Sequence, residues 1–117
     1  HWQNLVIAAC EQCGRNRVPQ VGPVLGLPDW LAQLDMPTPS DEARLLLSPG
    51  AAHSLREVAP VARMTLLVGP EGGLSSVETQ LAQSRGFIPV RLGPRILRTE
   101  TAALATLSAL QALWGDF

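Results

Sequence analysis

Three short apolar runs, each ended by a loop rich in glycine or proline, constrain the fold of this chain most. The runs are "ARLLLSPG" from residue 43, "RMTLLVGPEGG" from residue 63 and "FIPVRLG" from residue 87. Continuous apolar runs of this length are typical of strands buried on both faces, and helical patterns follow the second and third runs. We therefore predict an α/β fold in which a parallel sheet is flanked by helices on both faces.

Four segments have the spacing or end signals of helices. Residues 2–13 have apolar side chains three and four positions apart and end at Gly14, and residues 28–34 begin with a proline. Residues 74–84 open with a Ser75-x-x-Glu78 capping box. Residues 99–114 are rich in Ala and Leu on most faces, so we expect this helix to be buried on more than one side. Residues 51–60 fit no single pattern and are expected to form one helical turn and a loop.

The composition indicates one globular domain without a strong charge. The chain has 117 residues, is 46% hydrophobic and 16% charged, and has a net charge of −1, so it lacks the basic excess of many nucleic-acid-binding domains. It contains no long uninterrupted apolar run and no signal-peptide pattern near its start, which leads us to expect a soluble, cytoplasmic protein.

All nine basic residues are arginines, and four of them lie between residues 85 and 98. A guanidinium group suits phosphate, carboxylate and base edges, but arginines also form ordinary surface ion pairs. Cys10 and Cys13 form a C-x-x-C motif inside a helical pattern, with no second Cys or His pair downstream. We interpret both thiols as buried or half-buried structural side chains, and we expect no metal site.

The three strands end in unusual loops, at residues 48–50, 69–73 and 93–98. The carboxyl ends of parallel strands meet at one edge of a sheet, which is where ligands bind in such folds. The glycines of "GPEGG" would let the backbone approach a ligand closely. The chain has neither a Walker-type phosphate loop nor a G-x-G-x-x-G fingerprint. The pattern predicts a pocket that belongs to neither of these nucleotide-binding classes.

Four motifs together carry a specific resemblance. "AACEQCGRNRVPQV", "LLLSPG", "LLVGPEGGLSSVE" and "LGPRILRTETA" occur in this order over nearly the whole chain. In this combination the chain resembles the RsmE-type family, the bacterial 16S ribosomal RNA (uracil-N3) methyltransferases of the SPOUT superfamily. The resemblance implies a C-terminal deep trefoil knot, a homodimer, and S-adenosylmethionine bound in the knot.

The resemblance also implies a set of cofactor-binding residues drawn from the three loops. Aliphatic side chains there would cover the faces of adenine while backbone groups bond its edge. Ile96 and Leu97 would accordingly be interior residues, and Arg95 a surface or interface residue. The implied cofactor-binding residues are Leu47, Ser48, Gly69, Pro70, Glu71, Gly72, Gly73, Leu92, Gly93, Ile96, Leu97, Arg98, Thr101 and Ala102.

The implied reaction moves a methyl group to N3 of a uridine in 16S ribosomal RNA of the small subunit. The nitrogen is a poor nucleophile until its proton is lost, so a cation that stabilises the developing anion is useful. The substrate-side candidates are Gln12, Arg15 and Arg98, and Glu71 or Glu100 would orient an arginine. Arginine stays protonated and is therefore a poor general base. Glu100 fits equally well as a first-turn acidic residue of a helix.

The chain also differs from the family pattern. Nothing in it resembles the N-terminal RNA-binding barrel of the family, or the first strand and helix of the family's catalytic domain. We therefore expect residues 1–117 to be a partial methyltransferase domain that dimerises strongly and does not methylate ribosomes alone. Two other functions stay open: a knotted module that binds cofactor or RNA without turnover, and a SPOUT methyltransferase for another RNA site.

Overall fold

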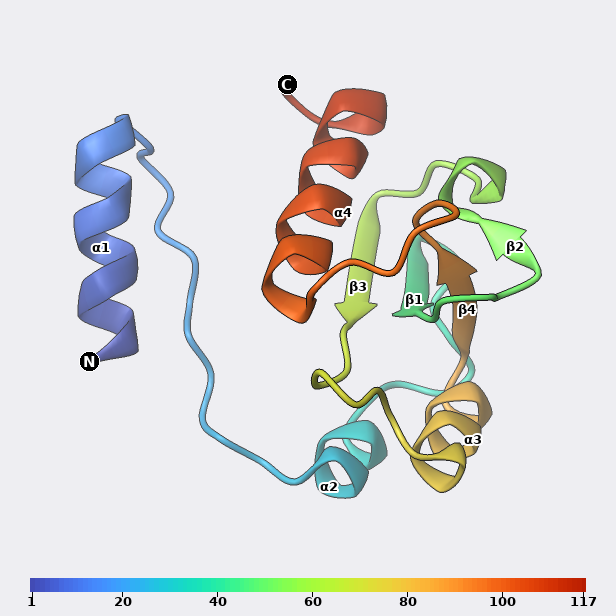
Figure 1. Cartoon of the computed structure of the whole chain (residues 1–117). Coiled ribbons are helices and arrows are strands. Elements are labelled where there is room, and N and C mark those ends of the chain that lie inside the picture. The colour runs from blue at the N-terminus through green and yellow to red at the C-terminus, as the bar shows by residue number, and fades with distance from the viewer.

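The computed structural model describes residues 1–117 and contains a four-stranded sheet with helices on both faces (Figure 1). The strands lie in the order β2-β4-β1-β3, and every neighbouring pair is parallel. This confirms the predicted α/β class and the parallel sheet. The strands are β1 (Glu42–Leu47), β2 (His53–Ser54), β3 (Arg63–Leu67) and β4 (Phe87–Arg91).

The sequence patterns missed β2, which occupies part of the ambiguous segment 51–60. It has only two residues, which pair with Val90 and Arg91 of β4. A single turn of 3-10 helix, Leu55–Glu57, follows it directly. A strand this short has too few residues to show an alternating pattern, so only its pairing with β4 reveals it.

The predicted helices are confirmed, with small shifts at the ends of two of them. Gly14 ends α1 in a left-handed conformation, with a φ of 78° that glycine adopts without strain. Both hydrogen bonds of the predicted capping box are present at Ser75 and Glu78. The helices are α1 (Trp2–Cys13), α2 (Leu27–Ala32), α3 (Ser76–Ser84) and α4 (Thr99–Trp114).

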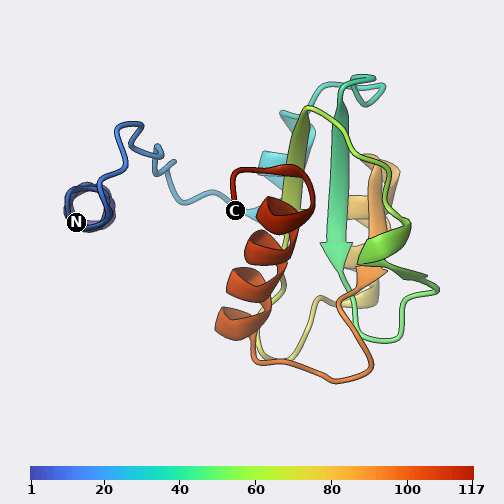
Figure 2. The same cartoon turned by 90° about the horizontal axis from the view of Figure 1, so that it is seen from above.

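The two faces of the sheet bury two separate apolar clusters. Neighbouring residues of a strand point to opposite faces. Leu46 packs with Leu31 of α2 and Ala82 of α3, whereas Leu45 packs on the other face in a cluster that Ala109 and Leu110 of α4 join. Helix α4 accordingly stands along one side of the sheet (Figure 2).

Two arginines attach α2 to the rest of the domain. The guanidinium of Arg85 donates to the carbonyls of Leu31 and Leu34 at 2.9 Å each. Arg44, which is 2% exposed, donates to the carbonyls of Asp35 and Arg85 at 2.8 Å each. Several of these bonds go to carbonyls at and just after the end of α2, where a helix leaves carbonyls without a full set of partners. Arg85 therefore has a structural role.

The prediction that α4 is buried on more than one side was wrong. Its only fully buried residue is Thr106, and the side chains of Leu104 and Leu107 are 69% and 51% exposed. One face of α4 covers the sheet, and nothing else in the chain packs on the opposite face. Apolar composition cannot distinguish a helix between two layers from a helix whose outer face has no partner within the same chain.

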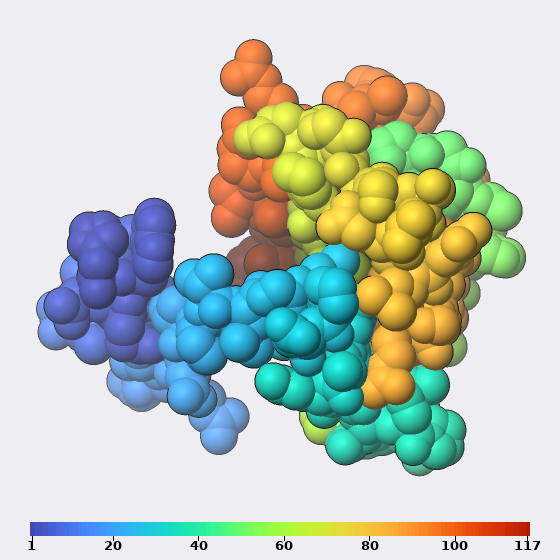
Figure 3. All heavy atoms as spheres, turned by 90° about the horizontal axis from the view of Figure 1, so that it is seen from below, coloured from blue at the N-terminus to red at the C-terminus, as the bar shows by residue number.

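Helix α1 lies away from the sheet, connected to α2 by an extended segment (Figures 1 and 3). The amide side chain of Gln3 bonds this segment on both sides, since it donates to the carbonyl of Pro19 and accepts from the N–H of Val21. Cys10 is buried as expected, but Cys13 is exposed, contrary to the prediction. No helix of the chain is both long and apolar enough to cross a membrane.

Candidate functional site

A large cavity lies at the carboxyl ends of β1, β3 and β4. It has a volume of about 860 Å³ and is lined by residues from 46–49, 68–74 and 92–102, together with Thr79 of α3. Close-packed parallel strands bring these distant segments to one edge of the sheet. The volume lies in the range of sites that hold a small molecule or cofactor.

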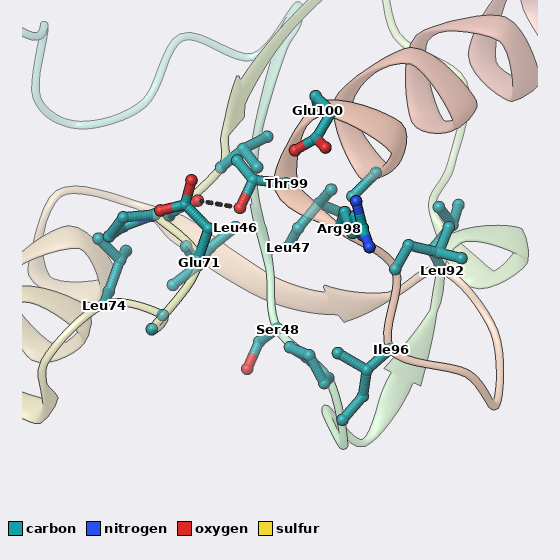
Figure 4. Close-up of a pocket in the computed structure, with 18 of the residues that line it drawn as sticks. Leu46, Leu47, Ser48, Glu71, Leu74, Leu92, Ile96, Arg98, Thr99 and Glu100 are labelled. Carbon is teal, nitrogen blue, oxygen red and sulfur yellow. Dashed lines mark hydrogen bonds between the residues drawn. The ribbon is translucent and has the colours of Figure 1, made fainter.

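The walls of this pocket combine aliphatic and charged side chains (Figure 4). Leucines 46, 47, 74 and 92 and Ile96 supply apolar surface, while Glu71, Glu100, Arg95 and Arg98 supply two charges of each sign. A ligand with a flat apolar ring at one end and charged groups at the other would find suitable contacts here. The two carboxylates with a lowered pKa, Asp41 beside Arg63 and Glu57 beside His53, do not line the pocket.

The central loop of the pocket, residues 68–74, folds back on itself. The N–H of Gly73 donates to the carbonyl of Pro70 at 2.8 Å. A Cβ atom at Gly69 would lie 3.1 Å from both the backbone nitrogen and Cγ of Leu74, whereas Gly72 has open space around it. Glycine at position 69 therefore permits the tight turn, and glycine at position 72 leaves the loop open toward ligand space.

The start of α4 is bonded to this loop. The hydroxyl of Thr99 donates to the carbonyl of Gly69 at 3.1 Å, and both residues line the pocket (Figure 4). Thr99 is half-buried and is the first residue of α4. The bond joins the start of a helix to a loop 30 residues earlier in the sequence.

The structure brings nearly all of the proposed cofactor-binding residues to this pocket. Every one of them lines it except Thr101, which is exposed on α4. Among the three substrate-side candidates, Arg98 lines the pocket and the other two do not. Gln12 and Arg15 are exposed at the end of α1, which lies apart from the sheet in Figure 1. The Nε group of Arg15 donates to the carbonyl of Arg17 at 2.7 Å.

The expectation that Ile96 and Leu97 are interior residues was wrong. Ile96 is 81% exposed and Leu97 is 38% exposed, although both line the pocket. They belong to an open wall of the pocket. Arg95 is exposed, as expected of a surface residue, but it too lines the pocket.

Several lining residues were not singled out in the sequence as cofactor-binding. Leu46, Val68 and Leu74 flank the predicted loops, and the apolar ends of the neighbouring strands were a signal for the first two. Thr99 was interpreted only as the opening of a helix, and Glu100 either as part of that opening or as a residue that orients an arginine. Pro49, Thr79 and Arg95 complete the additional lining residues. Thr79 reaches the pocket from the middle of α3, which no loop motif indicates.

The sequence of this chain matches a known protein family. A family model described as an RNA methyltransferase domain matches residues 1–111. The chain belongs to this family. The match covers all four strands and the pocket, so the motifs of the three loops are part of the family's domain.

Solved structures of similar proteins have the same fold over nearly the whole chain. The ribosomal RNA small subunit methyltransferase E of Neisseria gonorrhoeae, bound to S-adenosyl methionine, is 47% identical with a TM-score of 0.89 and covers 99% of this chain. A putative methyltransferase of Legionella pneumophila, in complex with the bound cofactor SAM, is 40% identical with a TM-score of 0.87 over 99%. This chain covers 48% and 46% of those two chains, respectively.

A curated relative is similar to the same extent. The ribosomal RNA small subunit methyltransferase E of Buchnera aphidicola is 41% identical over 117 residues, which are 99% of this chain and 46% of the relative. The chain thus spans about half the length of the curated relatives that it matches. The similarity applies to the domain that carries the pocket.

Proposed function

We propose that this chain is the catalytic part of an S-adenosylmethionine-dependent methyltransferase that acts on N3 of a uridine in 16S ribosomal RNA. The observation that carries the proposal is the pocket at the carboxyl ends of β1, β3 and β4, whose lining includes all but one of the residues that the resemblance assigns to the cofactor. Relatives with 47% and 40% identity bind this cofactor in their structures. A cytoplasmic location is part of the proposal, because bacterial ribosomes are there.

The residues of the pocket fit this cofactor. The aliphatic side chains of the pocket suit the two faces of adenine. The backbone at Gly72, which has open space around it, suits the polar edge of the ring. Glu71 and Glu100 supply negative charge for the cationic end of the molecule, and Arg95 or Arg98 supplies positive charge for its carboxylate. When bound, the cofactor supplies an electrophilic methyl group.

Arg98 is the residue of this chain that we assign to the substrate. Loss of the N3 proton places negative charge on the uracil, and a guanidinium at the pocket favours that charge as it develops. The walls of the pocket hold the reacting partners in line. Gln12 and Arg15 remain proposed substrate-side residues that act only when α1 packs against a pocket, within a larger assembly.

Three finer statements belong to the same proposal: a SPOUT-type trefoil knot, a homodimer, and ribosomal RNA of the small subunit as partner. Support for the knot comes from the path of the chain, since residues 92–98 run from β4 past the carboxyl ends of β1 and β3 to α4 (Figures 1 and 2). Support for the homodimer comes from the exposed leucines of α4. Pulling the chain from its two termini tests for the knot. The fully stretched length of a knotted chain would be less than the roughly 3.5 Å per residue that an unknotted chain reaches.

A second candidate function is a module that binds the cofactor without turnover. It is favoured by one observation, the separation of Gln12 and Arg15 from the pocket. Calorimetry with S-adenosylmethionine and S-adenosylhomocysteine tests binding, and methyl transfer to undermethylated small subunits tests catalysis by the chain and by its full-length protein. Binding without transfer by the full-length protein would favour the module.

A pair of glycine variants tests the assignment of the pocket. Gly72 lines the pocket and Gly22 lies in the segment after α1, and a Cβ at either position would meet no atom within 4 Å. We expect Gly72→Leu to weaken S-adenosylmethionine binding at least tenfold, because its side chain takes up ligand space, and Gly22→Leu to leave binding unchanged. Equal affinities for the two variants, or no binding by the unmodified chain, would contradict the proposed function.

A further inference from the structure

Thr99 makes the only hydrogen bond that joins the central loop of the pocket to the segment 92–102. Its hydroxyl donates to the carbonyl of Gly69 at 3.1 Å, and no backbone bond links these two parts of the chain. The two segments form facing walls of the same pocket. Their separation therefore depends on this contact and on side-chain packing.

The carbonyl of Gly69 has no partner in its own loop. That loop uses the carbonyl of Pro70 for its internal bond to Gly73, and the close approach of Leu74 to Gly69 allows no residue larger than glycine without displacement. A half-buried carbonyl without a partner costs free energy, so a donor from outside the loop stabilises this turn.

The hydroxyl of Thr99 is not needed for its own helix. Arg98 is the N-cap of α4, and its side chain makes no capping bond. Thr99 follows it as the first helical residue, and its hydroxyl bonds Gly69 instead of a backbone group of the helix. By contrast, the hydroxyl of Thr106 donates to the carbonyl of Ala102 one turn earlier, within α4.

We propose that Thr99 is a positioning residue that holds the central glycine loop against the start of α4 and thereby sets the shape of the cofactor pocket. The proposal rests on the proposed function for the identity of the ligand. It assigns Thr99 an indirect role, because its hydroxyl is committed to Gly69 and acts on the ligand through the loop.

The test compares Thr99→Val with Thr99→Ser in the full chain. Valine keeps the branched shape and removes the hydroxyl, while serine keeps the hydroxyl. We expect Thr99→Val to weaken S-adenosylmethionine binding by about fivefold or more, the effect of losing one hydrogen bond of ordinary strength. Thr99→Ser should restore binding to within about twofold. Thr106→Val is the matched control, since it removes a threonine hydroxyl from the same helix without touching the loop.

A second measurement, amide hydrogen exchange, needs no bound ligand. Loosening of the loop should speed amide hydrogen exchange at Gly73, whose N–H is bonded within it, in Thr99→Val but not in Thr99→Ser or Thr106→Val. Binding by Thr99→Val within twofold of the unmodified chain would overturn the inference.

The two proposals fail in different ways. If the unmodified chain binds no S-adenosylmethionine, the proposed function fails, and hydrogen exchange decides the role of Thr99 by itself. Faster exchange at Gly73 in Thr99→Val, with rescue by serine, would then support the positioning role. Unchanged exchange would overturn it.

Discussion

The four arginines between residues 85 and 98 divide into two pairs by what their guanidinium groups contact. Arg85 donates to carbonyls at the end of α2, and Arg91 donates to the carbonyls of Ala51 and Ala52 at 2.9 and 2.8 Å. Arg95 and Arg98 make no such bonds and line the pocket. A guanidinium that satisfies backbone carbonyls stabilises the fold, whereas one free at a pocket is available to a ligand.

At the same scale, the ion pair of Asp41 and Arg63 predicts a pH effect. Two bonds from Arg63, at 3.0 and 3.2 Å, hold the pKa of the Asp41 carboxyl below its usual range, and the positive charge of Arg63 adds to this effect. Because the folded pKa lies below the unfolded value, the pair stabilises the chain above about pH 4 and loses that effect as the pH falls through the folded pKa.

We expect carboxyl NMR titration to show a lowered pKa for Asp41 that returns to its ordinary value in Arg63→Gln. The stability difference between the two proteins should disappear at low pH. The exposed Arg56 serves as the control, since Arg56→Gln should leave the titration of Asp41 unchanged. An ordinary Asp41 titration in the unmodified chain would contradict the ion pair.

Among the helices, α3 is the one whose start is held by a pair of side-chain hydrogen bonds. The Ser75 hydroxyl accepts from the N–H of Glu78 at 3.1 Å, and the Glu78 carboxylate accepts from the N–H of Ser75 at 2.9 Å. These bonds satisfy two of the groups that a helix start leaves free. The helix begins directly after the central loop, so its start also limits where the loop can move.

Removal of the cap should therefore destabilise the chain measurably. We expect Ser75→Ala to lower the free energy of unfolding by about 1 kcal/mol, measured by urea titration. The neighbouring Ser76 makes no side-chain hydrogen bond, and Ser76→Ala should change stability by less than about 0.5 kcal/mol. Similar losses in both variants would show that the cap is not responsible.

At the scale of the whole molecule, the outer face of α4 is unusual because it carries leucines that are exposed to solvent. Leu104 and Leu107 lie one turn apart, and both are more than half exposed. Exposed leucines on one face of a helix are typical of a protein interface when they gather into a patch. The proposed homodimer would cover it.

We expect the chain to self-associate in analytical ultracentrifugation and the double variant Leu104→Glu with Leu107→Glu to sediment as a monomer. Charges on an interface that must desolvate them oppose association, but they cost little on an exposed helix face. Val77, which is 72% exposed on α3, provides the control, since Val77→Glu should leave the association unchanged. A monomeric unmodified chain would contradict the dimer.

Local pattern was enough to predict most of the elements. The bounds of α4 and α1, the capping box of α3 and the three longer strands follow from apolar spacing and end signals, which act over a few neighbouring residues. The edge of the sheet that carries the pocket was also predictable, because parallel strands necessarily bring their carboxyl ends together.

Tertiary structure alone decided the rest, because these features depend on contacts between residues far apart in the sequence. The two-residue strand β2 exists only through its pairing with β4, and the exposure of Ile96 and Leu104 depends on what packs over them. The bond from Thr99 to Gly69 requires the start of a helix to meet a loop 30 residues earlier in the sequence. By itself, the sequence determined which segments become strands, helices and pocket loops; the assembled fold decided which of their side chains meet.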